Sequence, residues 1–109
     1  MSQVSLTLDT KGFPIQALRL SNTAGDSFST AIGASSTRTA LPASTEVVRI
    51  CATVACHFAF GNSSVAATGS DPMLGAGAYD YITIPPGATH VAVIQEGAVT
   101  GNFITTRCI

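Results

Sequence analysis

Two cysteines and a histidine lie within the eight residues CATVACHF, from Cys51 to Phe58. Side chains of these types bind zinc, form redox pairs, and act together as nucleophile and base. Adjacent residues of a strand point to opposite faces, so Cys56 and His57 cannot approach one metal ion or one substrate from a strand. A zinc site also needs further paired ligands, and the sequence has no Cys-x-x-Cys and no nearby pair of histidines. We therefore predict neither a metal site nor a catalytic cysteine here.

The chain has three cysteines, Cys51, Cys56 and Cys108. An odd number without any sign of an oxidising compartment predicts free thiols. A disulfide between Cys51 and Cys56 would require their strands to pair as a tight hairpin. Cys56 shares its strand face with Phe58 and Phe60, which predicts an inert thiol in the core. Cys51 and His57 are expected to face outward.

The acidic residues offer one alternative chemistry. Asp71 and Asp80 flank a single loop, and two converging carboxylates could hydrolyse a glycoside. The simpler interpretation is that Asp71 caps a turn before Pro72 and that Asp80 is a solvated strand residue. Alternation predicts that Asp80 faces outward from a side lined by Tyr79 and Tyr81, whose rings could stack against a sugar. We expect no enzyme activity and no cofactor, and retain Tyr79, Asp80 and Tyr81 as an alternative ligand patch.

The composition limits the kind of partner. Charged residues make up 10% of the 109 residues, against roughly 25% in a typical soluble domain. The five Lys and Arg residues are scattered, so we expect neither nucleic-acid binding nor a polybasic membrane anchor. No apolar run approaches the roughly 20 residues of a membrane-spanning helix, and the N-terminus lacks the pattern of a signal peptide. A surface of Ser, Thr, Gly, Ala and Asn loses little hydration on contact, which favours packing against other proteins.

The elements that position these residues are predicted to be strands. Short alternating runs are separated by Gly, Pro, Asn, Asp and Ser clusters, and helical periodicity is nearly absent. The strongest runs are EVVRICA (46–52), ACHFAFG (55–61), YDYITI (79–84), HVAVIQE (90–96) and GNFITTRCI (101–109), and the weaker ones are QVSLTL (3–8), PIQALRL (14–20) and SFSTAIGA (27–34). TGSDPMLGAGA (68–78) is predicted to be a loop. About eight strands predict one all-β domain over residues 1–109, a compact β-sandwich or jelly-roll-like barrel.

One segment is echoed later in the chain. PASTEVVRI (42–50) and PGATHVAVI (86–94) share Pro, Thr, Val and Ile at matching positions. The echo indicates either a structural pseudo-repeat of two equivalent hairpins or turn chemistry that the two segments share.

The N-terminal residues have two possible roles. QVSLTL places Val4, Leu6 and Leu8 on one face of a strand. Residues 1–12 are either an extended assembly arm, with these three side chains facing a partner, or the first strand of the domain's own sheet.

The stretch from Glu46 to Gly101 carries a likeness to a known group of proteins. It contains VVRI, CHFAFG followed by a short turn, SDPMLGAGAYDYITIP and AVIQEGAVTG. In strand order and turn residues it resembles capsid decoration (cement) proteins of phages and similar small head-associated β-proteins. The resemblance implies a non-enzymatic module on the capsid surface, made in the host cytoplasm. Its partners would be the major capsid protein and its own copies, with a trimer favoured.

Two alternatives to this interpretation remain. One is a small β-sandwich that binds carbohydrate through Tyr79, Asp80 and Tyr81. The other is a tail, collar or fibre component of a phage.

Overall fold

The computed structural model of the protein describes residues 6–8, 14–16 and 19–109. These residues form ten strands and no helix, and hence no helix long and apolar enough to cross a membrane. The strands are β1 (Leu6–Leu8), β2 (Pro14–Gln16), β3 (Ser27–Ile32), β4 (Thr37–Ala40), β5 (Val47–Ala52), β6 (Cys56–Gly61), β7 (Met73–Leu74), β8 (Tyr79–Thr83), β9 (His90–Gln95) and β10 (Gly101–Cys108).

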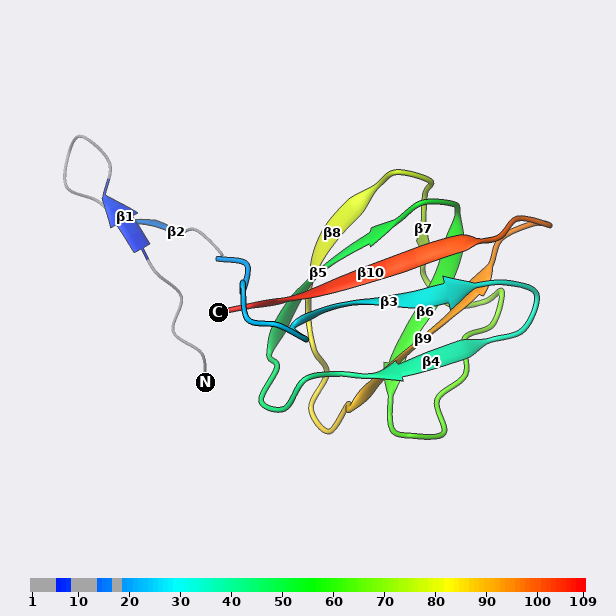
Figure 1. Cartoon of the computed structure of the whole chain (residues 1–109), viewed down its shortest axis with the longest axis horizontal. Helices are drawn as coiled ribbons and strands as arrows, with labels where there is room; N and C mark the ends of the chain where they lie inside the picture. Colours follow the sequence, from blue (N-terminus) through cyan, green and yellow to red (C-terminus); the bar gives the residue numbers. More distant parts are fainter. Residues whose placement is uncertain (1–5, 9–13, 17–18) are drawn as a thin grey trace.

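Eight of these strands form two antiparallel sheets that face each other (Figure 1). The first sheet has the order β3-β10-β5-β8, and the second has the order β4-β9-β6-β7. The pairing is nested, since β3 pairs with β10, β4 with β9, β5 with β8, and β6 with β7. The chain is thus one long hairpin, rolled up so that β10 also meets β5 and β9 also meets β6. The predicted all-β sandwich is confirmed.

The core lies between the two sheets and follows the alternation of the sequence. In β5, Val48, Ile50 and Ala52 are fully buried, while the residues between them are partly exposed. Phe58 from β6 meets Phe103 from β10 across the sandwich, with ring centroids 5.8 Å apart. Aliphatic and aromatic side chains from both sheets therefore form one apolar core, and burying them is the main term that stabilises the fold.

The five strong runs of the sequence are all strands, and β3 begins at Ser27 as predicted. Two strands were not predicted from the sequence. β4 has the sequence TRTA and lies at a sheet edge with mostly exposed side chains, so no apolar alternation marks it. β7 is only two residues long and lies within the predicted loop 68–78, where it pairs with Cys56 and His57.

Of the two explanations for the echoed segments, a pseudo-repeat of two equivalent hairpins is wrong. β5 and β6 belong to different sheets, and so do β9 and β10, so each connection crosses the sandwich instead of joining paired strands. The echoed residues also face opposite ways, because Val91 points into the core whereas its counterpart Val47 lies on the other side of β5 from buried Val48. The two turns differ as well, since positive φ falls on Ser44 (60°) in the first and on Gly87 (82°) in the second. The echo is therefore a likeness of sequence around two prolines and not of structure.

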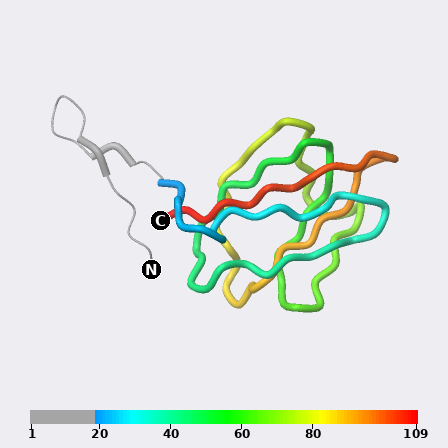
Figure 2. Tube along the Cα trace, in the orientation of Figure 1, coloured from blue at the N-terminus to red at the C-terminus, as the bar shows by residue number. Residues whose placement is uncertain are grey.

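The N-terminal strands stand apart from both four-stranded sheets. β1 and β2 pair only with each other in a two-stranded sheet. Val4 of the predicted arm lies outside the described residues, and Leu6 and Leu8 belong to β1. Farther along, Leu20 forms an isolated bridge with Cys108, so the chain enters and leaves the sandwich at the same end (Figure 2).

Candidate functional site

The outer face of the β3-β10-β5-β8 sheet carries two exposed tyrosines among small polar side chains. Tyr79 is 60% exposed and Tyr81 is 42% exposed, so two neighbouring aromatic rings are in contact with solvent. Away from the tyrosines, small polar side chains on β3 and β10 bond one another: Ser27 bonds Thr106 (2.9 Å), and Ser29 bonds Asn102 (3.2 Å). Ala31, Ile104, Val47 and Cys51 lie on the same face. We call this surface, with Arg49 at its centre beside the tyrosines, the tyrosine face.

The tyrosines lie on the outer side of β8, so the prediction that Asp80 faces outward from the side opposite the tyrosines is wrong. The register pairs Tyr81 with Arg49 on the outer face of β5, and Asp80 with the buried Ile50. The tyrosines therefore face solvent, while Asp80 lies on the side of the core residues. Asp80 is nevertheless exposed, because β8 is the edge strand and little of the other sheet covers it. A period-two pattern tells which residues share a face but not which face is covered.

The tyrosine rings are ordered by their neighbours. The ring centroids of Tyr79 and Tyr81 are 6.3 Å apart at an interplanar angle of 89°, a T-shaped contact. The guanidinium carbon of Arg49 lies 4.8 Å from the centroid of the Tyr79 ring, within the range of a cation–π interaction. Because the rings are perpendicular and Arg49 covers one face of Tyr79, they do not form a common flat platform for a sugar.

Asp80 closes part of the free edge of the sheet. In an antiparallel strand, alternate residues direct their backbone groups to the partner strand and away from it. The N–H of Ile84 donates to the carbonyl of Glu46 beside β5 (2.7 Å), so the N–H of Tyr81, an odd number of residues away, points to the free edge. There it donates to the carboxylate of Asp80 (2.8 Å). A charged side chain that occupies this donor disfavours pairing with another strand, so the face of β8 is better suited to contact than its edge.

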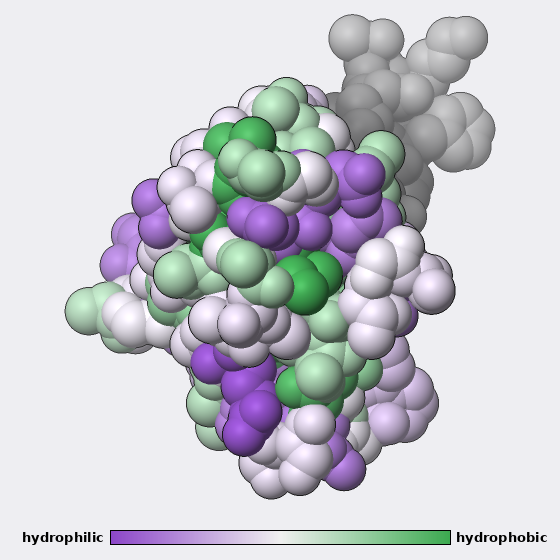
Figure 3. Space-filling model, turned by 90° about the vertical axis from the view of Figure 1, so that its right-hand side faces the viewer, coloured by the Kyte–Doolittle hydropathy of each residue, from purple (hydrophilic) through white to green (hydrophobic). Residues whose placement is uncertain are grey.

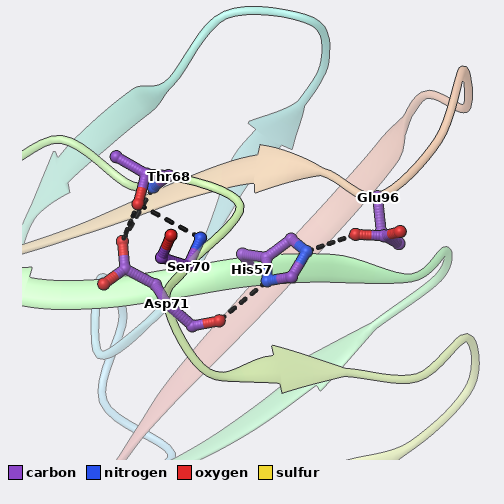
Figure 4. A network of polar contacts seen from close by, with 5 residues as sticks. All are labelled: His57, Thr68, Ser70, Asp71 and Glu96. Atoms are coloured by element: carbon purple, nitrogen blue, oxygen red, sulfur yellow. Dashed lines mark hydrogen bonds and ion pairs between the residues drawn. The ribbon is translucent and has the colours of Figure 1, made fainter.

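His57 forms a second polar cluster, on the outer face of the other sheet (Figure 4). It points away from the core, as predicted, yet it is only 7% exposed. Its Nδ1 lies 2.8 Å from the carbonyl oxygen of Asp71, and its Nε2 contacts the carboxylate of Glu96. The hydrogen bond with the Asp71 carbonyl, followed by that with Glu96, raises the pKa of His57 above its ordinary value, against the opposing effect of burial.

The role predicted for Asp71 is confirmed. Its carboxylate accepts a hydrogen bond from the N–H of Thr68 (2.7 Å), and its own N–H donates to the Thr68 carbonyl (3.1 Å), which closes a turn before Pro72. No local pattern predicts the contact between His57 and Glu96, which are 39 residues apart. The pairing of β6 with β9 brings them together.

The cysteines are free thiols in the structure, and their strands explain why. Cys51 and Cys56 lie on strands of different sheets, so no hairpin brings them together. Cys56 is fully buried, which confirms its predicted core position, and burial raises its pKa to about 11. Burial also raises the pKa of Cys108. Within the described chain, no three His, Cys, Asp or Glu side chains come close enough to hold a metal ion.

An open depression of about 510 Å³ lies elsewhere on the surface of the described residues. It lies where the start of β5 meets the turn between β8 and β9, and Val47, Ile84, Pro85 and Pro86 contribute its apolar lining. Figure 3 looks onto the opposite end of the sandwich, where the connections β3–β4 and β9–β10 lie (Figure 1). Apolar residues there are interspersed with polar ones. The most distinctive contact surface is therefore the tyrosine face.

The fold and these surfaces define a small all-β sandwich with an ordered aromatic face. Comparison with known proteins finds no matching family model, no matching curated protein and no matching solved structure.

Proposed function

We propose that the protein is a non-enzymatic structural component of a phage virion, namely a capsid decoration or cement protein. In this proposal it lies on the capsid surface and packs against the major capsid protein and its own copies. The observation that carries the proposal is the tyrosine face: two exposed aromatic side chains in contact with each other, on a sheet face with a single charged side chain, Arg49, beside them.

The chemistry of this face suits contact with a protein. Tyrosine and arginine are enriched at interface centres, where they provide most of the binding energy. Tyr79 and Tyr81 are held by each other and by Arg49, so they lose little further freedom on binding. The surrounding serines and threonines are cheaper to desolvate than ions.

The topology gives further support by analogy. The nested pairing of eight strands in two sheets resembles that of a jelly roll, an architecture found in viral capsid proteins as well as in lectins and cupins. The analogy concerns the fold and not a site, so it supports the proposal only together with the tyrosine face and the resemblance noted above.

Co-sedimentation tests the proposal. The protein is mixed with expanded shells of the major capsid protein encoded in the same genome, and the shells are separated on a density gradient. We expect stoichiometric binding by the wild type and binding weakened about 30-fold by Tyr81→Ser, because truncating a central interface tyrosine costs about 2 kcal/mol. Met73→Ser is the matched control, since Met73 is 58% exposed but lies on the other sheet. Wild-type protein that stays at the top of the gradient would contradict the proposal.

Oligomeric state is measured separately. Sedimentation equilibrium of the purified protein should show a homo-oligomer, with a trimer expected. If only the shell-bound protein is oligomeric, the contacts between copies depend on the capsid lattice.

Carbohydrate binding is the second candidate function. The observation in its favour is the ring of Tyr79, which is 60% exposed, since an aromatic ring in contact with solvent can stack against a sugar. A glycan array separates the two proposals. Protein that ignores shells but binds glycans, and loses this binding in Tyr79→Ser, belongs to the second class. A tail, collar or fibre component would instead co-purify with tails after virions are split into heads and tails.

A further inference from the structure

The loop of residues 62–72 covers part of the outer face of the β4-β9-β6-β7 sheet. Ala92 points away from the core on β9 and yet is fully buried. The loop leaves the end of β6, and its Ala67 N–H donates to the hydroxyl of Ser36 in the turn between β3 and β4 (2.8 Å). It therefore spans the sheet from β6 toward β4. At its start, a Cβ on Gly61 would lie 2.9 Å from Cβ of Val65, so a glycine is required for this close approach.

His57 links this cover loop to the end of β9. Its Nδ1 faces the backbone carbonyl of Asp71 in the loop, and its Nε2 faces the carboxylate of Glu96, which follows β9. Both partners can only accept hydrogen bonds, whereas a neutral imidazole has a single N–H to donate. Only the protonated ring, with an N–H on each nitrogen, satisfies both contacts at once.

We propose that His57 is an imidazolium ion in the folded protein at neutral pH, and that its deprotonation at higher pH releases the 62–72 cover loop from the sheet. The protonated ring holds the loop by a hydrogen bond and holds Glu96 by a charge-assisted one. In the neutral ring, one nitrogen carries a lone pair that faces a hydrogen-bond acceptor, and this contact is repulsive. The loop relieves the repulsion by moving away from the ring.

The surroundings of His57 favour the charged form. Its neighbours in the sheet, Met73 on β7 and Ile94 on β9, carry no charge. The charged groups that face it are Glu96 and Asp71, and both are acidic. Arg38 on β4 lies on the same outer face but two strands away, where it pairs with Ala92.

The direction of the pH dependence follows from these contacts. The hydrogen bonds with the Asp71 carbonyl and with Glu96 raise the pKa of His57 in the folded state above its ordinary value of 6.5. Because the pKa of His57 is higher in the folded state than in the unfolded state, protonation of His57 stabilises the fold. This stabilisation is fully present below the unfolded-state pKa and is lost as the pH rises through the folded-state pKa. Between the unfolded-state and folded-state pKa values of His57, the equilibrium constant for unfolding increases by up to about tenfold per pH unit.

Nuclear magnetic resonance of the ring nitrogens tests the charge state in the wild-type protein. With ¹⁵N-labelled histidine at pH 7, we expect both nitrogens of His57 to show the shifts of protonated nitrogen. A neutral tautomer with one bare nitrogen at this pH would overturn the proposal. Glu96→Gln keeps an acceptor oxygen at the position but removes the charge, and should move the titration of His57 to lower pH.

Hydrogen exchange and urea unfolding between pH 6.5 and 9 test the release of the loop. After correction for intrinsic exchange rates, the protection of the Ala67 amide should fall with pH while that of Val93 in the core persists. His57→Gln should unfold with a flatter pH dependence, and the control His90→Gln should keep the wild-type decline. Equal declines in wild type and His57→Gln, or constant protection of Ala67, would refute the proposal.

Discussion

The hydroxyl of Thr105 is an unusual feature of the core, and replacing it should stabilise the protein. Thr105 is fully buried on β10 opposite Ile50, and its Oγ1 finds no hydrogen-bond partner among the described residues. A buried hydroxyl without a partner costs about 1–3 kcal/mol in proteins. Valine has the same shape with a methyl group in place of the hydroxyl. We therefore expect Thr105→Val to be about 1–3 kcal/mol more stable than the wild type.

Urea unfolding followed by circular dichroism measures this effect. With a denaturant dependence of about 2 kcal/mol per molar, the midpoint should rise by about 0.5–1.5 M at an unchanged slope. Thr30→Val is the matched control. Thr30 is also buried, but its hydroxyl bonds that of Thr39 on the facing sheet (2.8 Å). Its removal should lower stability by about 0.5–1.5 kcal/mol.

The contrast between the two substitutions makes the result decisive. If Thr105→Val is no more stable than the wild type, the hydroxyl has a partner or a solvent path, and the reasoning fails. If both substitutions stabilise the protein equally, valine's preference for strands explains the gain and the unpaired hydroxyl does not.

Three further predictions concern the core and the connection between β5 and β6, which joins the two sheets. Phe103→Ala removes the ring that packs on Phe58 and should destabilise the protein by about 3–5 kcal/mol in urea unfolding, with a loss below 1 kcal/mol contradicting its central position. Gly101→Ala would place a Cβ 2.8 Å from Cγ2 of Val54 and should lower the free energy of unfolding by about 1–3 kcal/mol. An unchanged melting temperature in calorimetry would contradict this prediction. The pKa of Cys56 is about 11, so only about one Cys56 thiol in a thousand is ionised at pH 8. This thiol should therefore resist alkylation by iodoacetamide in the native protein and react in urea. Mass spectrometry measures the alkylation.

Local patterns in the sequence were sufficient for most strands but not for their partners. In β5 and β6 the alternation predicted correctly which residues share a face, because this depends only on the pleat of the strand. It could not show that β5 and β6 belong to different sheets, since a short connection can join a hairpin or cross a sandwich. The edge strand β4 has little apolar surface to bury, so its sequence carries no signal.

The candidate sites were predictable to a smaller extent. Tyr79 and Tyr81 were recognised as a pair, but their exposure depends on which face of β8 the other sheet covers, and no local pattern shows this. His57 was correctly assigned to the face opposite the core, yet its burial depends on the cover loop and on Glu96. Both sites depend on contacts between residues far apart in the chain.

The nested pairing has a consequence for biosynthesis. β3 is the first strand of the sandwich and its neighbour β10 is the last, so the bond between Ser27 and Thr106 joins residues 79 positions apart. While the ribosome is still making the second half of the chain, β3 has no strand to pair with, because β10, one of the two central strands of the first sheet, is missing. Sandwiches dominated by such distant pairings fold in about milliseconds to seconds. Newly made chains therefore acquire their sheets together, after β10 has emerged, and until then their unpaired strands are exposed to aggregation.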